Sequence, residues 1–190
     1  SPSDTAELSQ CLEQALYKDK GIVAVRYPRG CELYRSGTKA YSDFRHVSNK
    51  SRKLIFTYGR ISAYAYTIHG VDVLQAIKIF PIADEMIDIC LAYDEIYAFE
   101  EGEREGGIAQ KLCTALALAG FKGRFTITAV DGFVRHADVA AQLHNAMLDA
   151  DGMRKITGED DAETTGCLSF RKQHSKKPQP CRIAHKAGKR

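Results

Sequence analysis

Short apolar segments that favour strands alternate with amphipathic segments that favour helices along most of this 190-residue chain. Lys53–Tyr58, residues 71–79 and Arg124–Val130 are short and contain many β-branched or aromatic residues, which predicts strands. The segments between them repeat apolar residues at helical spacing. Because parallel neighbours need a crossover connection, usually a helix, this alternation predicts an α/β domain with a mixed, mostly parallel sheet.

The elements before the first of these strands differ in character. Ser3 and Asp4 predict a helix cap, with Glu7 placed to reach back to it. Residues 22–26 are apolar and predict a buried strand, which a Pro-Gly turn follows. Residues 31–52 are polar and irregular, so they predict a linker with one short strand near residues 43–47.

The remaining helices follow the strands in order. Amphipathic spacing and caps predict helices at residues 61–69, 84–92, 108–119 and 138–148, and residues 96–99 predict a short strand. From residue 158 the pattern stops, and we expect residues 158–190 to be a disordered tail. The predicted organisation is therefore residues 1–30, the linker 31–52, a domain at 53–157 and the tail.

The net charge of +3 comes from the tail. Without residues 171–190 there are 19 basic and 24 acidic residues, a net charge of −5. A basic tail suits nucleic acid or another anionic surface, but no aromatic residue after Phe170 interleaves with its charges. We therefore favour a solvated extension and do not expect nucleic acid as a partner. The eight basic residues of the tail are Arg171, Lys172, Lys176, Lys177, Arg182, Lys186, Lys189 and Arg190.

The cysteines and histidines predict no metal site. No two of the six cysteines are separated by two residues, and the histidines lack metal-ligand spacing. Cys11, Cys90 and Cys113 fall on apolar helix faces, so we expect buried free thiols in a reducing cytoplasm. No secretory signal is visible, and no apolar run approaches the roughly 18 residues that span a membrane. We expect a cytoplasmic location and no membrane partner.

Six segments, in order, resemble the 1-deoxy-D-xylulose-5-phosphate synthases, a transketolase-like family. The match runs from about residue 1 to 157, and its Arg-Tyr-Pro-Arg-Gly segment points to this family rather than to other transketolase-like enzymes. Cys31 and Ala137 depart from the family pattern, which indicates a divergent member. The matching segments are Val23-Ala24-Val25-Arg26-Tyr27-Pro28-Arg29-Gly30, Tyr58-Gly59, Phe80-Pro81-Ile82-Ala83-Asp84-Glu85, Glu100-Glu101-Gly102 with Gly106-Gly107, Asp131-Gly132-Phe133-Val134-Arg135-His136, and Leu148-Asp149-Ala150-Asp151-Gly152-Met153.

The resemblance implies a fold and an activity. The fold would be a three-layer domain of the transketolase C-terminal type at residues 53–157, after the end of a pyrimidine-binding domain at residues 1–30. The parent enzyme would be a homodimer that uses thiamine diphosphate and magnesium to condense pyruvate with glyceraldehyde 3-phosphate. Its product would feed isoprenoid, thiamine and pyridoxal biosynthesis.

The resemblance also implies what this chain lacks. The family holds the diphosphate and magnesium through a Gly-Asp-Gly motif, and no such motif occurs in these 190 residues. The family's essential glutamate would lie upstream of Ser1. We therefore expect the chain to be inactive alone, to bind no cofactor, and to need the N-terminal and pyrimidine-binding domains as partners.

Five residues are candidates for the site. The resemblance assigns Arg29 to the phosphate of the aldehyde substrate, and a guanidinium fork suits a phosphate, although a surface arginine in a turn is the alternative. We expect Arg26 to be a structural ion-pair partner. Glu100 and Glu101 are either a carboxylate pair for acid–base chemistry or interdomain contacts. His136 lines a cleft or lies in a turn or interface.

Two alternatives remain open to the interpretation that the chain is the C-terminal part of such a synthase. The chain is a separate C-terminal subunit of a split transketolase-like enzyme, or it is a non-catalytic anion-binding module of similar fold. A partner chain with a Gly-Asp-Gly motif would favour the subunit. The module would need a Gly-x-Gly-x-x-Gly loop after the first strand, and Tyr58-Gly59-Arg60-Ile61-Ser62-Ala63 does not supply it.

Overall fold

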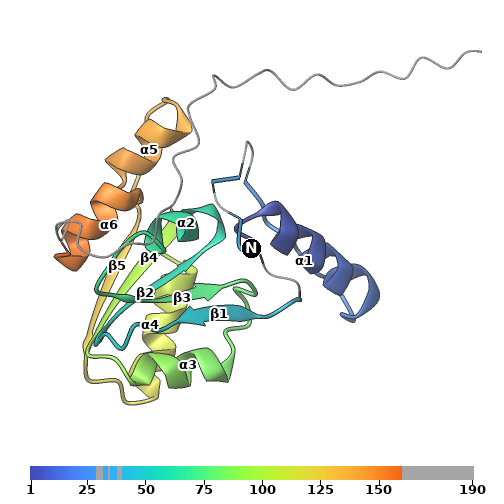
Figure 1. Ribbon diagram of the computed structural model, residues 1–190, viewed down its shortest axis with the longest axis horizontal. Coiled ribbons are helices and arrows are strands. Elements are labelled where there is room, and N and C mark those ends of the chain that lie inside the picture. Colours follow the sequence, from blue (N-terminus) through green and yellow to red (C-terminus); the bar gives the residue numbers. More distant parts are fainter. Residues whose placement is uncertain (29–31, 34, 38–39, 160–190) are drawn as a thin grey trace, which may run out of the picture.

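The chain forms an α/β domain with an additional helix at its N-terminal end (Figure 1). The computed structural model describes residues 1–28, 32–33, 35–37 and 40–159. The predicted tail therefore lies almost wholly outside the described residues. In chain order the elements are α1 (Thr5–Tyr17), β1 (Phe44–Val47), β2 (Lys53–Tyr58), the 3₁₀ helix η1 (Gly59–Ile61), α2 (Ser62–Ala65), β3 (Asp72–Ala76), α3 (Asp84–Leu91), β4 (Glu95–Glu103), α4 (Ile108–Leu118), β5 (Arg124–Val130), α5 (Val139–Asn145) and α6 (Ala150–Thr157).

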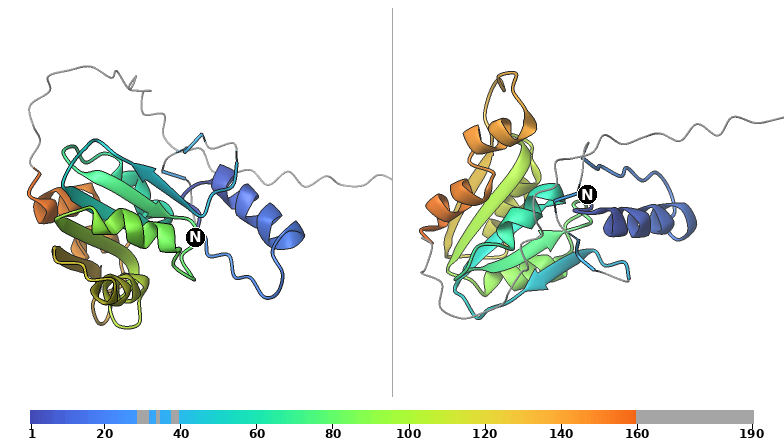
Figure 2. Two further views of the ribbon diagram at one scale, coloured as in Figure 1. Left: turned by 90° about the horizontal axis from the view of Figure 1, so that it is seen from below. Right: turned by 45° about the horizontal axis from the view of Figure 1, so that its top comes forward.

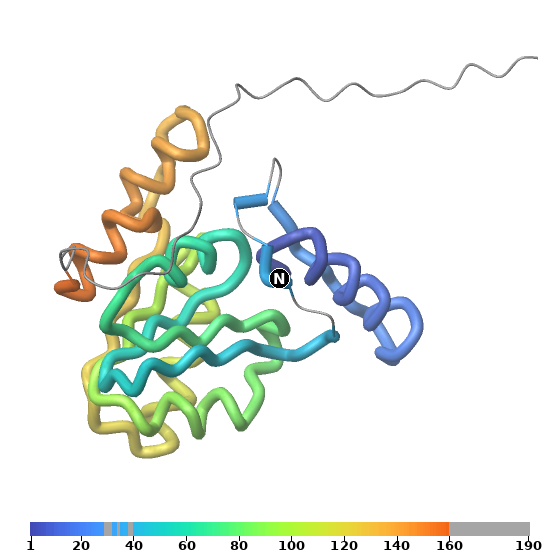
Figure 3. Tube along the Cα trace, in the orientation of Figure 1, coloured from blue at the N-terminus to red at the C-terminus, as the bar shows by residue number. Residues whose placement is uncertain are grey.

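The sheet has the strand order β1-β3-β2-β4-β5. β3, β2, β4 and β5 are parallel, and β1 pairs antiparallel with β3. The prediction of a mixed, mostly parallel sheet is confirmed. After β2 the chain crosses to β3 on one side and then returns to the other side of β2 as β4, a path that can be followed in Figure 3. The order of the strands thus reverses between β2 and β4.

Apolar side chains of the sheet contribute to a separate hydrophobic core on each face, because successive residues of a strand point to opposite sides. Leu54 and Phe56 pack with Met86 of α3 and Leu112 of α4. On the other face, Ile55 belongs to a second core, to which α5 and α6 contribute Leu143 and Met153. The sheet is therefore the middle of three layers.

α1 lies beside the sheet, on the opposite side of the molecule from α5 and α6 (Figure 2). As predicted, Asp4 caps it: its carboxylate accepts a hydrogen bond from the Glu7 amide at 2.8 Å. The Glu7 carboxylate, 1% exposed, accepts hydrogen bonds from Gln75 of β3 and Arg45 of β1, each at 2.9 Å. A buried charge that is paired in this way fastens α1 to the sheet.

The strand predicted at residues 22–26 is wrong. These residues belong to no strand, Ile22 is fully exposed, and 43% of Val23 is exposed. A strand exists only where a neighbouring strand accepts its hydrogen bonds, and the described sheet offers this segment no place. The apolar stripe of α1 is likewise uncovered in part, with Leu12 and Leu16 exposed.

Four other predictions are corrected by the structure. The helix predicted at 61–69 is replaced by the two short helices η1 and α2, which end at Ala65. The strand predicted at 96–99 is longer, because β4 continues to Glu103, with a register shift between Glu100 and Glu103. The last predicted helix ends early, at Asn145, and Met147 after it adopts a positive φ of 58°; α6, which was not predicted, begins after Asp149. Cys113 is half-buried rather than buried, whereas Cys11 and Cys90 are buried.

Among the described residues no helix combines the length and the apolar character that crossing a bilayer requires.

Candidate functional site

The carboxyl ends of β2 and β4 form the candidate site, because the strand order reverses between them. Ligands of open α/β sheets bind outside the carboxyl ends of the strands at such a switch point. Tyr58, Gly59 and Arg60 lie at the end of β2, and Glu100 and Glu101 lie near the end of β4. The N-terminal segment reaches the same place through Arg26.

Glu100 is buried, with 3% of its surface exposed, and it joins β4 to two other elements. One carboxylate oxygen accepts hydrogen bonds from the Tyr58 hydroxyl at 2.8 Å and from the Ile108 amide at 3.0 Å. The other accepts from the Ala109 amide at 2.9 Å. The carboxylate therefore caps α4, where free amides and the helix dipole favour a negative charge.

Gly107 makes room for this carboxylate. It is the N-cap residue of α4 and offers no side chain of its own as a cap. A Cβ at this position would lie 2.5 Å from the Glu103 carbonyl oxygen and 2.6 Å from the Glu100 carboxylate. The Gly106-Gly107 pair thus permits close packing of α4 onto the end of β4.

Arg26 holds the N-terminal segment against the site. Its guanidinium donates to the Tyr58 hydroxyl at 3.3 Å and to the Glu101 carbonyl, and it lies 5.6 Å from the centre of the Tyr58 ring. Burial raises the pKa of Tyr58, and the Glu100 carboxylate raises it further, so the hydroxyl stays neutral. Arg26 was predicted to be an ion-pair partner, but among the described residues its contacts are with a hydroxyl, a ring and a carbonyl.

Glu101 pairs with Arg60 across the switch point. Two guanidinium nitrogens of Arg60 donate to the two carboxylate oxygens, one of them at 2.9 Å. The side chains are 17% and 26% exposed, so the pair is partly shielded from water. Glu100 and Glu101 therefore have different partners, and the structure does not bring them together as a carboxylate pair.

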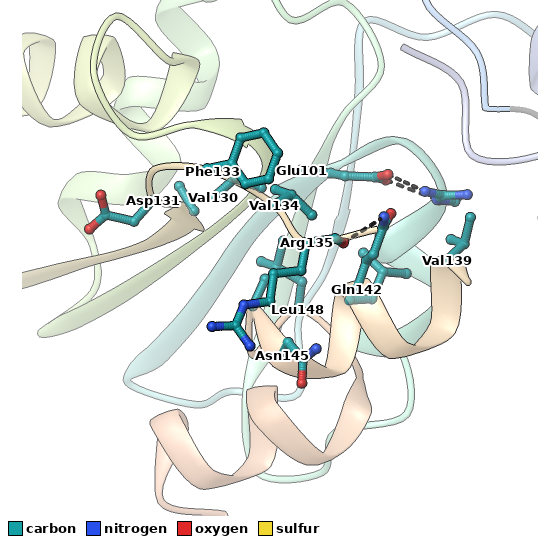
Figure 4. Close-up of a pocket in the computed structure, with 14 residues that line it drawn as sticks. Glu101, Val130, Asp131, Phe133, Val134, Arg135, Val139, Gln142, Asn145 and Leu148 are labelled. Carbon is teal, nitrogen blue, oxygen red and sulfur yellow. Dashed lines mark hydrogen bonds and ion pairs between the residues drawn. The ribbon is translucent and has the colours of Figure 1, made fainter. Parts of the chain in front are cut away.

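A pocket of about 580 Å³ opens beside this ion pair, between the loop after β5 and α5 (Figure 4). Arg60 and Glu101 line one end, and Val134 and Gln142 belong to its walls. His136 lies exposed in the same loop and is not one of the lining residues. Arg29 lies outside the described residues.

Sequence reasoning missed the roles of Tyr58 and Arg60. Both flank Gly59, which has a positive φ of 65° at the end of the first parallel strand. A polar side chain at that position of an α/β sheet is a signal that was available, because switch points lie beside the first strand. Among the described residues, no group of three or more His, Cys, Asp or Glu side chains is arranged to hold a metal ion.

Comparisons with known proteins agree with these motifs. No family model matches the chain. The chain is 28% identical over 171 residues to the 1-deoxy-D-xylulose-5-phosphate synthase of Acidovorax sp. (strain JS42), which covers 83% of this chain and 27% of the relative. The synthase of Chlorobium phaeovibrioides is 29% identical over 165 residues, covering 79% of this chain and 26% of the relative.

A solved structure shows the same fold. A protein described as a split gene transketolase, inactive β4 tetramer, superposes with a TM-score of 0.57 at 15% identity, covering 70% of this chain and 46% of that chain. The chain spans about a quarter of the length of the curated relatives it matches. In sequence the chain is thus similar to the C-terminal part of 1-deoxy-D-xylulose-5-phosphate synthases, as its motifs indicated, and it has a transketolase-type fold.

Proposed function

We propose that this chain serves as the C-terminal part of a transketolase-type enzyme that forms 1-deoxy-D-xylulose 5-phosphate from pyruvate and glyceraldehyde 3-phosphate. One observation carries the proposal: the similarity spans 83% of this chain but only 27% of the relative. In this role the chain supports the assembly and the binding of the substrate phosphate, and it is inactive alone.

This chain does not supply the Gly-Asp-Gly motif through which the resemblance implies that thiamine diphosphate and magnesium are held. Among the described residues, no group of three or more His, Cys, Asp or Glu side chains is arranged to hold a metal ion. The buried carboxylate of Glu100 already accepts hydrogen bonds from Tyr58 and two amides of α4. We propose that residues outside this chain hold the cofactor.

The position of Arg26 supports a phosphate role for Arg29. Arg26 is held at the carboxyl edge of the sheet by Tyr58 and Glu101, and Arg29 follows it by three residues. Oxyanions gather at this edge in α/β proteins, and a guanidinium matches a phosphate in geometry and charge.

We expect Arg29→Ala to raise the KM for glyceraldehyde 3-phosphate by about 100-fold, because a charged hydrogen-bonding partner of the phosphate is lost. The KM for pyruvate, which carries no phosphate, should stay within about twofold. The measurement is steady-state kinetics of a synthase whose own C-terminal part is replaced by this chain. Arg29→Lys is the matched variant and should recover part of the loss. Equal effects on both substrates would contradict the assignment.

The same experiment tests the proposed function as a whole. A hybrid enzyme that assembles and makes the pentulose phosphate supports it. This chain alone, with thiamine diphosphate and magnesium added, should make none. Product from the isolated chain, or a hybrid that folds and dimerises without any activity, would overturn the proposal.

A second candidate is a separate subunit of a split enzyme. The solved protein of the same fold is named as a split gene transketolase that forms an inactive β4 tetramer, which favours this alternative. Affinity purification of the chain from its own cells distinguishes the two. Recovery of a separate chain with a Gly-Asp-Gly motif, in a complex that is active only when both are present, would establish the subunit.

A further inference from the structure

The cavity between the β5 end and α5, called here the β5–α5 pocket, has the size of a ligand site. Its volume of about 580 Å³ lies within the range of roughly 300–1,000 Å³ that is typical of small-molecule sites. It opens at the carboxyl ends of β4 and β5, beside the switch point, where α/β proteins bind ligands. The pocket plays no part in the proposed function above.

Apolar side chains form most of its walls. Ala129 and Leu143 are buried in its floor, with 7% and 5% of their surfaces exposed. At the rim, Val134, Val139 and Phe133 are 44%, 46% and 95% exposed. Apolar surface concentrated around a cavity favours an occupant with an apolar body, because burial of that surface is the main source of affinity.

The charges of the pocket are unequal at its two ends. At one end Glu101 neutralises Arg60. Figure 4 shows the Arg135 guanidinium extending away from that pair, on the side of Asn145. Among the described residues no carboxylate forms an ion pair with Arg135, and Asp131 lies 4.0 Å from a different arginine, Arg104. The Arg135 end thus offers an uncompensated positive charge with an amide nearby.

We propose that the β5–α5 pocket binds a small organic anion whose apolar body packs against Val134, Val139 and Leu143 and whose carboxylate or phosphate pairs with Arg135. The uncompensated cation at one end and the apolar wall beside it select this class over a neutral apolar molecule or a bare inorganic anion.

Nuclear magnetic resonance of the full 190-residue chain, labelled with ¹⁵N, tests the proposal with four probes. Phenyl phosphate and phenylacetate carry both an aromatic body and an anion, whereas inorganic phosphate and benzyl alcohol each carry one of these. We expect saturable shifts of the amides of residues 130–146 with one or both aromatic anions. Inorganic phosphate and benzyl alcohol should bind about tenfold more weakly or not at all. The stronger of the two anions identifies the preferred acid group.

Matched variants separate the pocket from the rest of the surface. Ala146→Leu, just after α5, fills the pocket and should abolish the shifts, while Ala140→Leu, at an exposed position of α5, should leave them unchanged. Arg135→Gln should weaken binding about tenfold, and Arg135→Lys should retain most of it. Lys155→Gln removes an exposed charge elsewhere and serves as the control.

Three results would overturn the proposal. They are shifts that do not saturate, shifts outside the pocket, and binding that Ala146→Leu and Arg135→Gln leave intact. If Ala146→Leu loses the dispersed spectrum of a folded chain, Val139→Gln provides the second test, since it makes an exposed wall of the pocket polar. These outcomes do not depend on enzyme activity, so the experiment tests ligand binding in the pocket independently of the proposed function.

Discussion

At the carboxyl edge of the sheet, the side chain of Glu100 joins β2, β4 and α4. Its three hydrogen bonds come from the Tyr58 hydroxyl and the amides of Ile108 and Ala109. Each donor loses its partner if the carboxylate is removed, and a buried donor without a partner is more costly than a hydrogen bond is worth.

We expect Glu100→Ala to lower the free energy of unfolding by about 3 kcal/mol, because three donors lose their acceptor. Glu100→Gln should cost about 1–2 kcal/mol, since the amide keeps one acceptor oxygen but turns its NH₂ group toward another donor. Urea unfolding monitored by circular dichroism measures both. Glu101→Gln, which changes the neighbouring and only partly shielded pair with Arg60, is the control and should cost no more than about 1 kcal/mol. Equal losses for Glu100→Ala and Glu101→Gln would contradict this account.

A second buried carboxylate, Asp72, organises the amino edge of the sheet. It accepts hydrogen bonds from the hydroxyls of Tyr93 and Ser48 and from the amide of Asn49, each at 2.7 Å. The Ser51 amide adds a fourth at 3.1 Å. Burial raises the pKa of Asp72, but these hydrogen bonds outweigh it and hold the pKa below its ordinary value.

The lowered pKa of Asp72 fixes the sign of a pH effect. A carboxyl whose pKa is lower in the folded state contributes stability above its unfolded pKa of about 3.9, and this contribution is lost as the pH falls through the folded value. We therefore expect the stability difference between the natural chain and Asp72→Asn to narrow below about pH 4. Urea unfolding at pH 7 and at several values below 4 measures it. A difference that stays constant over this range would refute the linkage.

Among the elements, α6 depends on a close approach to the turn before it. Asp149 caps α6 through the Gly152 amide at 2.9 Å, and Met153 is fully buried in the second core. A Cβ on Gly152 would lie 2.6 Å from backbone atoms of Met147, a distance that side chains do not reach. Alanine normally favours a helix over glycine by about 1 kcal/mol, so this position should reverse the usual order.

We expect Gly152→Ala to destabilise the chain by about 2 kcal/mol, because the backbone at Met147 must move and the packing of Met153 is disturbed. Thermal unfolding by calorimetry is the measurement. Asp151→Ala, at the exposed neighbouring position, serves as the control and should stay within about 0.5 kcal/mol. A stabilising effect of Gly152→Ala would show that the turn adapts.

The elements differ in how far the sequence alone predicts them. β2 and β5 have the predicted bounds because a short apolar run with turn signals at both ends leaves few alternatives. Residues 22–26 carry the same signal yet form no strand, since pairing depends on neighbours that a local pattern does not contain. α6 was missed although Asp149 before it and Gly158 after it are ordinary end signals.

The candidate site was harder to predict than the elements. The motif that contains Glu100 and Gly107 lies at the carboxyl end of β4, and a Cβ at Gly107 would collide with the Glu100 carboxylate there. The contact between Tyr58 and Glu100 joins residues 42 apart, and only the strand order brings them together. The role of Arg60 could not be predicted locally, because its partner Glu101 lies on another strand. The predicted phosphate role of Arg29 and the place of His136 in a cleft stay predictions.

Viewed as a whole, the molecule exposes apolar surface at its N-terminal end. Leu16 is 71% exposed and Tyr17 81% on α1, and Ile22 in the following segment is fully exposed. Such a patch is costly in water and suits a protein partner. It agrees with the expectation that the chain needs other domains as partners, and it would equally suit a second copy of the chain.

We expect the combined change Leu16→Glu and Ile22→Asp to weaken self-association of the chain by about tenfold or more, because two apolar contacts are lost and charges are introduced. Sedimentation velocity over a range of concentrations measures the association. Leu118→Glu is the matched control, since Leu118 is 86% exposed but lies on α4. An equal effect of the control would mean that association is unspecific.

β1, which runs antiparallel to β3 in the described sheet, determines at which edge of the sheet the preceding segment lies. Phe44 begins β1 opposite Ala76, at the carboxyl edge of β3, and Val47 ends it opposite Val73 near the amino edge, where β2 then starts. Four residues of β1 thus carry the chain once across the sheet before its parallel strands begin. Without β1, the segment before β2 would lie at the amino edge of the sheet, where β2 starts. With it, the segment that precedes β1 in this chain lies at the carboxyl edge of the sheet, where Arg26 contacts Tyr58 and Glu101 and where ligands of such sheets bind.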